Sequence, residues 1–343
     1  MEWLWISLGI LLTLALITPL VFHLLIVRNY IPIVVRIFQE KPLFIMPFGR
    51  PVSDAEEVTV MTSDGLTLHG CYLRTPLPRK GVLLFGLEFG SNRWSCLPYC
   101  EFLRASGYDI FTFEMRGQGE SPAQKGYEPL QWVTDFEVID FQAGVAYLKN
   151  RPDRDPRGIG LFGLSKGGSA GLMVAAQDPF IRCCVVDGAF ASLTTTVPYM
   201  RRFVQIYSAL PWLAKHIPYW YLRIAGQIGI RRIEKIRDCH YPLLERYMPM
   251  LAPRPLLMIH GGADNYITPE IARALFDLAE HPKELWLVDK AKHNQSIHLA
   301  AEEYKRRVLE FFDKHLAGQS QAAIGVLPPG VSSQVEPAPR SHA

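Results

Sequence analysis

The sequence predicts an α/β protein in which helices cover both faces of a mostly parallel central sheet. One transmembrane helix precedes this domain, and a helical lid interrupts it. Three observations lead to this prediction. A charge-free apolar run opens the chain, short apolar runs alternate with helical stretches after residue 55, and residues 193–253 break that alternation. A chain of 343 residues has room for one large domain with an insertion and tails.

Composition excludes several classes of protein. With 49% hydrophobic and 20% charged residues, the chain is not disordered throughout. Its net charge of +3 is too small for a protein that binds nucleic acid by bulk electrostatics. The six cysteines show no paired C-x-x-C spacing, so we expect buried free thiols and no metal site. The oligomeric state is left open by these numbers.

The first 30 residues are typical of a membrane anchor. No charged residue occurs from Trp3 to Val27, a stretch longer than the roughly 20 residues that cross a bilayer core. Trp3, Trp5 and Tyr30 stand where interfacial aromatic residues are common. A signal peptide is the alternative, but it requires a basic first segment and a small-residue cleavage site, and neither is present. The sequence therefore favours a permanent single-pass anchor over residues 1–30.

Flanking charge predicts the orientation of this anchor. No lysine or arginine precedes the apolar run, whereas four basic residues follow it: Arg28, Arg36, Lys41 and Arg50. The positive-inside rule then places the domain that follows in the cytoplasm. Residues 31–54, apolar with few charges, are expected to form a membrane-proximal linker that lies along the membrane surface.

Residues 55–317 are expected to form the main domain, which begins with an antiparallel hairpin. Strand-like residues 58–62 and 66–73 flank the turn Ser63-Asp64-Gly65. Apolar runs that predict buried strands follow at 82–86, 109–115, 158–163, 183–188, 255–261 and 284–289. Helical patterns lie near 95–106, 134–149, 166–177, 270–280 and 297–316. Residues 318–343 lack periodicity and are predicted to be a disordered tail.

Residues 193–253 are too long for a bare connection, which predicts a small helical lid. The segment is rich in aromatic residues, and basic residues outnumber Glu234 and Asp238 between 193 and 241: Arg201, Arg202, Lys215, Arg223, Arg231, Arg232, Lys235 and Arg237. Such a surface can rest on anionic lipid headgroups. An alternative that the sequence supports equally is a helical layer that packs over the core and turns its basic face to solvent.

The chemistry of the chain centres on Ser165. Residues 163–167, Gly-Leu-Ser-Lys-Gly, fit the G-x-S-x-G pattern, and they follow an apolar strand and open a helix. Gly163 and Gly167 allow the sharp nucleophile-elbow turn. The start of the helix presents free N–H groups to a developing oxyanion. Ser165 is therefore the predicted nucleophile.

A serine nucleophile needs a base, and the base needs an acid to orient it. In this arrangement the chain order is serine, acid, histidine. Asp264 follows the strand run 255–261 and His293 follows 284–289, so both lie at carboxyl ends of strands. Among the competitors His298 falls in the last helix, His260 ends a strand and is expected to pack, and Asp187 lies in turn-like sequence.

Residues 57–316 resemble the serine α/β-hydrolases of the esterase and lipase branch. The resemblance rests on the 163–167 motif, on FEMRGQGES (113–121), on RPLLMIHGGADNYITP (254–269) and on PKELWLVDKAKH (282–293). The resemblance implies the α/β-hydrolase fold and acyl transfer to water, with no metal or cofactor. These motifs are specific for the fold and not for the substrate.

One motif departs from the family, which usually has His-Gly after the third strand. This chain reads Phe85-Gly86-Leu87-Glu88, so the backbone N–H of Leu87 is expected to form the oxyanion hole with that of Lys166. Glu88 brings a carboxylate to this region. If the carboxylate points inward, we expect slower turnover of ordinary esters or a preference for a cationic or hydroxyl-bearing substrate. If it points outward, we expect no effect on catalysis.

Together these features predict a membrane-anchored serine hydrolase of carboxylic esters. Its expected partners are a small-molecule or lipid ester and membrane lipids. The anchor and the apolar lid favour a lipid-like or long-acyl substrate. An acyl-protein or acyl-CoA thioesterase would use the same triad. A non-catalytic interaction protein on a hydrolase fold is the alternative from another class, motivated by the altered oxyanion loop.

Overall fold

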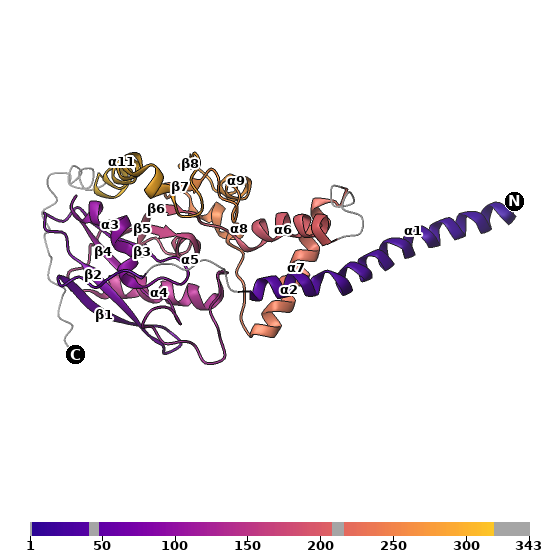
Figure 1. Cartoon of the computed structure of the whole chain (residues 1–343), viewed down its shortest axis with the longest axis horizontal. Coiled ribbons are helices and arrows are strands. Elements are labelled where there is room, and N and C mark those ends of the chain that lie inside the picture. Colours follow the sequence, from indigo (N-terminus) through magenta and orange to yellow (C-terminus); the bar gives the residue numbers. More distant parts are fainter. Residues whose placement is uncertain (1, 41–47, 208–215, 319–343) are drawn as a thin grey trace, which may run out of the picture.

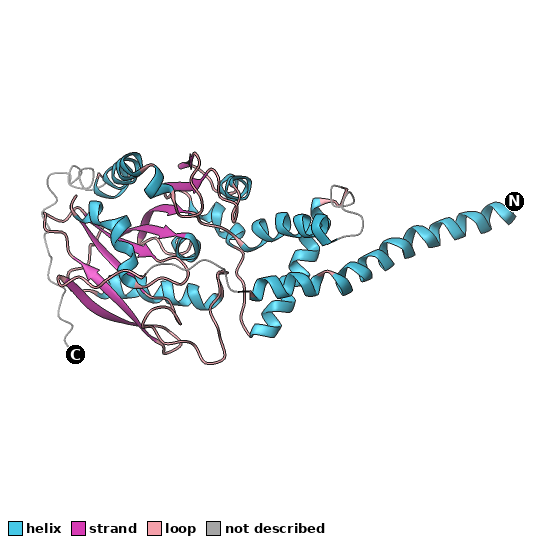
Figure 2. Ribbon diagram, viewed as in Figure 1, coloured by secondary structure: helices cyan, strands magenta, loops and turns pink. Residues whose placement is uncertain are grey.

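The predicted α/β fold is confirmed by a computed structural model, which describes residues 2–40, 48–207 and 216–318. Its central feature is an eight-stranded sheet in the order β1-β2-β4-β3-β5-β6-β7-β8 (Figures 1 and 2). The strands are β1 (Ala55–Met61), β2 (Thr67–Leu73), β3 (Gly81–Gly86), β4 (Tyr108–Phe113), β5 (Ile159–Leu164), β6 (Ile181–Asp187), β7 (Leu256–Gly261) and β8 (Lys283–Val288). The tail predicted at 318–343 lies outside the described residues except for Gly318.

The helices are α1 (Glu2–Asn29), α2 (Ile31–Gln39), α3 (Leu97–Arg104), α4 (Asp135–Asn150), α5 (Ser165–Ala175), α6 (Ser192–Tyr207), α7 (Tyr219–Arg237), α8 (Leu244–Tyr247), α9 (Pro269–Asp277), α10 (Ser296–Leu299) and α11 (Ala301–Phe312). Helices α1 and α2 precede the sheet, α3 to α9 lie between strands β3 and β8, and α10 and α11 follow β8. Shorter turns are η1 (Arg93–Cys96), η3 (Met248–Leu251) and η4 (Asp313–Ala317). The stretch predicted as one helix at 297–316 is divided into α10, α11 and η4.

The sheet is antiparallel at one end and parallel elsewhere. Strand β2 pairs antiparallel with β1 and β4, whereas β4, β3, β5, β6, β7 and β8 run parallel. The turn between β1 and β2 is closed by Thr62, whose N–H donates to the Leu66 carbonyl at 2.8 Å. Because parallel strands end at the same edge, residues that follow β3, β5, β7 and β8 are brought together.

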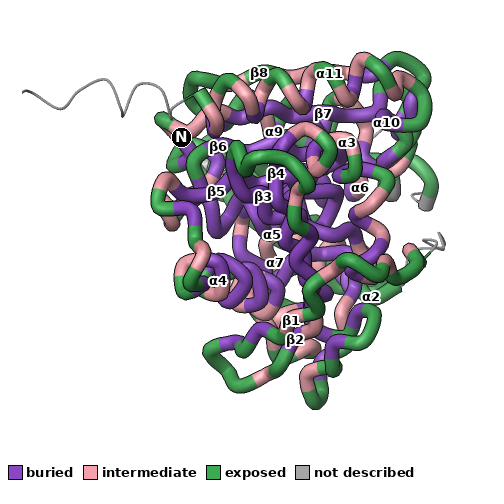
Figure 3. Tube along the Cα trace, turned by 90° about the vertical axis from the view of Figure 1, so that its left-hand side faces the viewer, coloured by how far each residue is buried: buried purple, intermediate pink, exposed green. Residues whose placement is uncertain are grey.

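Helices on both faces bury the sheet. Along β3, Val82 and Leu84 pack toward α4 and α5, whereas Leu83 and Phe85 pack toward α3 and α11. All residues of β3, β4 and β5 are buried, which explains why these strands read as continuous apolar runs. The buried trace of β3, β5 and α5 lies at the centre of the domain in Figure 3.

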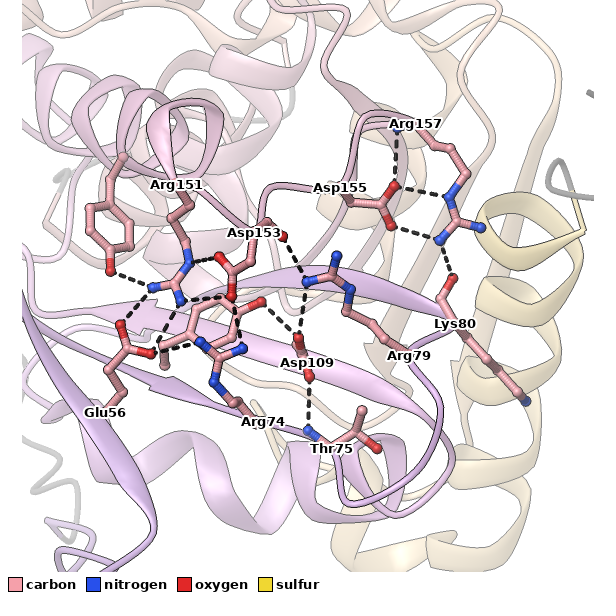
Figure 4. A network of polar contacts seen from close by, with 12 residues as sticks. Glu56, Arg74, Thr75, Arg79, Lys80, Asp109, Arg151, Asp153, Asp155 and Arg157 are labelled. Carbon is pink, nitrogen blue, oxygen red and sulfur yellow. Dashed lines mark hydrogen bonds and ion pairs between the residues drawn. The ribbon is translucent and has the colours of Figure 1, made fainter.

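A charged network ties the amino ends of the parallel strands, at the edge opposite to the carboxyl ends (Figure 4). Arg151 binds Glu56 of β1 at 2.8 Å and Asp153 at 2.7 Å, and Asp153 also accepts from Arg74 at 2.8 Å. These basic and acidic side chains neutralise one another. The network therefore holds the hairpin to the loop before β5.

The inserted helices form a separate layer with α2. Helices α6 and α7 lie beside the main domain, and α2 packs on α7 (Figure 1). Four residues of α2 whose burial is described, Ile31, Val34, Val35 and Phe38, are buried and share a cluster with Leu222, Ala225 and Ile233 of α7. From the sequence we predict that residues 31–54 form a linker along the membrane surface. In the structure, the i, i+3, i+4, i+7 spacing within α2 forms an apolar helical face that α7 covers.

Helix α1 projects away from the rest of the protein (Figure 1). The helical stretch from Trp3 to Arg36 contains an 18-residue window with a mean hydropathy of 2.6. Among the described residues it is the one helix long and apolar enough to span a membrane. A signal sequence passes the same test of length and composition. Near its end, His23 contacts the insertion, with Nδ1 3.0 Å from the Tyr221 hydroxyl.

Candidate active site

Ser165 lies at the sharp turn between β5 and α5. Its φ of 46° is in the left-handed region that L-residues rarely adopt. The turn is tight on both sides, because a Cβ on Gly163 would lie 2.5 Å from Cα of Gly168 and one on Gly167 2.3 Å from the Leu87 carbonyl oxygen. The two elbow glycines are therefore required for close packing, and they bring the turn against the loop after β3.

Three predicted side chains meet at this turn. Oγ of Ser165 lies 3.0 Å from Nε2 of His293, and Nδ1 of His293 lies 2.6 Å from Oδ2 of Asp264. The other oxygen of Asp264 accepts the N–H groups of Tyr266 at 2.8 Å and Ile267 at 2.9 Å. Asp264 is only 2% exposed and Ser165 6%. The acid is thus held by backbone donors in the orientation that faces the histidine.

The loops that carry Asp264 and His293 are also joined to each other. The N–H groups of Gly262 and Ala263 donate to the carbonyls of Val288 at 2.7 Å and Ala291 at 2.8 Å. A Cβ on Gly261 would lie 2.5 Å from the Ala291 carbonyl oxygen, so the loops are in contact. Residues 29 positions apart in the chain are therefore held in register at the carboxyl edge of β7 and β8.

The competing residues occupy other positions. His260 is buried with Nε2 2.7 Å from the Ile267 carbonyl and 3.4 Å from Asp264. Burial lowers the pKa of His260, so the neutral ring donates to that carbonyl. Asp187 is buried at the end of β6, where Ser296 Oγ donates to it at 3.2 Å. Burial raises the pKa of Asp187 to about 7.

The residues predicted to form the oxyanion hole lie on adjacent segments. Leu87 follows β3 and is buried, and Lys166 occupies the first turn of α5, where backbone N–H groups are free of partners within the helix. The Lys166 side chain is engaged elsewhere. Its ammonium lies 2.9 Å from Glu137 of α4 and donates to the Leu130 carbonyl at 2.6 Å. Only the backbone of Lys166 is therefore available to a reacting group.

Glu88 points inward, the case in which we expect weaker ester turnover or a cationic or hydroxyl-bearing substrate unless the carboxylate is engaged. Its side chain is buried and accepts a hydrogen bond from Nδ2 of Asn294, the residue after His293, so the carboxylate is bound to the histidine loop. Burial raises the pKa of Glu88, although Asn294 and His293 oppose this effect. Tyr99 in turn donates its hydroxyl to the Asn294 carbonyl at 3.2 Å. Glu88 thus ties the loop after β3 to the histidine loop.

Sequence reasoning singled out Glu88 but missed its partner. Asn294 adopts a φ of 54°, a conformation that asparagine tolerates better than most residues. An asparagine directly after the candidate histidine was the available signal for a turn at this point. Asp187, which the sequence offers only as a rival acid, also lies in this buried polar cluster.

Comparisons with known proteins agree with this architecture. A family model described as "Alpha/beta hydrolase family" matches residues 67–307, and the chain belongs to this family. Membership supports a hydrolase as the class of protein.

The relatives are distant but matched over most of their length. The uncharacterized protein YfhR of Escherichia coli O157:H7 is 26% identical over 255 residues, which are 72% of this chain and 76% of YfhR. The alpha/beta hydrolase domain-containing protein WAV2 of Arabidopsis thaliana is 21% identical over 295 residues, 81% of this chain and 88% of its own. Among solved structures, the Pyrococcus furiosus esterase Pf2001 superposes with a TM-score of 0.59 at 23% identity, covering 81% of this chain and 99% of the esterase.

Proposed function

We propose that this protein is a serine hydrolase that cleaves carboxylic esters through Ser165, His293 and Asp264. The observation that carries the proposal is the continuous chain of contacts from Oγ of Ser165 through both ring nitrogens of His293 to Asp264. A nucleophile, a base and an orienting acid need this arrangement.

In the proposed mechanism, His293 takes the proton from Ser165 as the serine oxygen attacks the acyl carbonyl. The backbone N–H groups of Leu87 and Lys166 stabilise the negative charge on the carbonyl oxygen. His293 then returns the proton to the leaving alcohol, which leaves an acyl group on Ser165. Water, deprotonated by His293, releases the acid and restores the serine. Asp264 orients the imidazole and stabilises its charged form.

We also propose that residues 1–30 anchor the enzyme in a membrane, with residues 55–317 as a cytoplasmic catalytic domain and 193–253 as its lid. The length and hydropathy of α1 and the basic residues after it support this topology. An enzyme tethered in this way meets substrates that partition into the bilayer, so a lipid-like or long-acyl ester is the favoured substrate class.

The test is labelling of the detergent-solubilised full chain with a fluorophosphonate probe, beside the Ser165→Ala variant. Labelling of the parent alone supports an activated serine at this position. A folded parent that resists the probe, or a variant that labels equally, contradicts the proposal and favours a non-catalytic role. Turnover of matched oxygen esters and thioesters then separates an esterase from a thioesterase.

A further inference from the structure

An apolar pocket of about 430 Å³ lies where the membrane helix meets the insertion. One wall is the end of α1, with Pro19, Phe22 and His23. The facing wall is the start of α7, with Trp220, Tyr221 and Ile224. Its volume falls within the range of small-molecule sites in proteins.

Two of the polar side chains that line this pocket face one another. His23 Nδ1 and the Tyr221 hydroxyl lie 3.0 Å apart, and their rings meet edge to face. Large apolar side chains remain uncovered around them. Trp220 is 62% exposed, Ile224 46% and Phe22 42%. A surface of this kind favours a hydrocarbon occupant over a polar one.

The position of the pocket along α1 identifies the source of that hydrocarbon. At 1.5 Å per residue, the helix from Trp3 to His23 spans about 30 Å, the thickness of a bilayer core. If Trp3 marks one boundary of the core, Phe22 and His23 lie at the other. Trp220 and Tyr221 then lie at the same depth, where aromatic side chains are favoured.

Exposed basic residues lie near the pocket residues along both helices. Arg28 follows the pocket residues of α1 by about one turn and a half, and Arg223 stands one turn from Trp220 on α7; both are exposed. Guanidinium groups in this position suit lipid phosphates.

We propose that the pocket between α1 and α7 holds one acyl chain of a phospholipid from the leaflet beside the catalytic domain. A third of its lining residues belong to the membrane-spanning helix itself, so the lipid around that helix is the natural occupant. The bound acyl chain holds the start of α7 against the membrane surface. This proposal rests on the membrane anchor of the proposed function, and it assigns the exposed apolar start of α7 to the bilayer rather than to solvent.

The experiment uses the full chain reconstituted in phosphatidylcholine vesicles that contain a phospholipid with a diazirine on its acyl chain. After irradiation, tryptic peptides are analysed for lipid adducts. We expect adducts on α1 and also on the peptides that contain residues 216–223 and 224–231. Ile224→Asn, an exposed position, should lower the adducts on α7 several-fold and leave those on α1 unchanged.

Ile236→Asn is the matched control, because Ile236 is 58% exposed on the same helix but lies outside the pocket. This variant should label as the parent does. Adducts on α1 without adducts on α7 would overturn the pocket while leaving the anchor intact. An equal loss of α7 adducts in both variants would indicate general contact of α7 with the membrane, and this result would also overturn the proposed pocket. Absence of adducts on α1 would refute the anchor, whereas probe labelling of Ser165 reports on the hydrolase separately.

Discussion

The buried ion pair beneath the elbow yields a quantitative prediction. Lys166 and Glu137 are both fully buried with 2.9 Å between charged atoms. Glu137 also accepts the N–H and hydroxyl of Thr134, each at 2.7 Å, and the Tyr127 hydroxyl at 2.8 Å. Lys166→Met keeps the unbranched apolar stem of the side chain but leaves a buried carboxylate without its counter-charge.

Breaking a buried pair in this way costs roughly 3–5 kcal/mol. We expect the lower half of that range, because three hydrogen bonds to Glu137 remain. At roughly 2–4 °C per kcal/mol for a domain of this size, the Tm should fall by about 6–16 °C. The assay is thermal unfolding of the detergent-solubilised chain, followed by near-ultraviolet circular dichroism.

The pH dependence of the free energy of unfolding gives a second test of the Lys166→Met variant. In the parent, burial alone would raise the pKa of Glu137, but Lys166 and Thr134 hold it below its usual range. The parent carboxylate thus contributes stability above its unfolded pKa, and this is lost as the pH falls through the folded value. Without Lys166, burial raises this pKa, so stability is lost as the pH rises. The deficit of the variant should therefore be smaller at pH 5 than at pH 8.

The control is Lys166→Met combined with Glu137→Gln, which removes both charges and keeps an acceptor for Thr134. This double variant should recover most of the lost stability. The single variant, while folded, should still react with a fluorophosphonate, since the proposed oxyanion donor is the backbone N–H of Lys166. A single variant as stable as the parent, or a double variant less stable than the single one, would refute the reasoning.

Two further predictions concern the cluster around the histidine. Asp187 has its pKa raised from 3.8 to about 7 by burial, so stability present at low pH is lost as the pH rises toward 7. Asp187→Asn should remove this loss, which is worth at most about 4 kcal/mol. The measurement is the free energy of unfolding by denaturant from pH 3.5 to 9, and the same pH dependence in both proteins would contradict the prediction. Gly188 has a φ of 69°, and an added Cβ would lie 2.5 Å from Oδ1 of Asn294 and 3.1 Å from Cε1 of His293. Gly188→Ala should therefore slow fluorophosphonate labelling of Ser165 by at least about tenfold, which corresponds to ~1.4 kcal/mol. Labelling at the parent rate would show that the histidine loop tolerates the added methyl group.

Local patterns in the sequence predict much of this protein. Continuous apolar runs predict buried parallel strands, and the G-x-S-x-G turn places Ser165 between β5 and α5. Parallel strands share one carboxyl edge, so the sequence alone indicates residues that follow β7 and β8 as candidate partners of Ser165. These inferences succeed because strand and turn formation depend on neighbouring residues.

Contacts between distant segments were decided only by the tertiary structure. The spacing of Ile31, Val34, Val35 and Phe38 indicates one apolar helical face, but a membrane and helix α7 bury such a face equally well. Glu88 was recognised as unusual, yet its direction depends on Asn294, roughly 200 residues later in the chain. Periodicity reports that a side chain is buried, whereas the identity of its partner depends on how the whole chain packs.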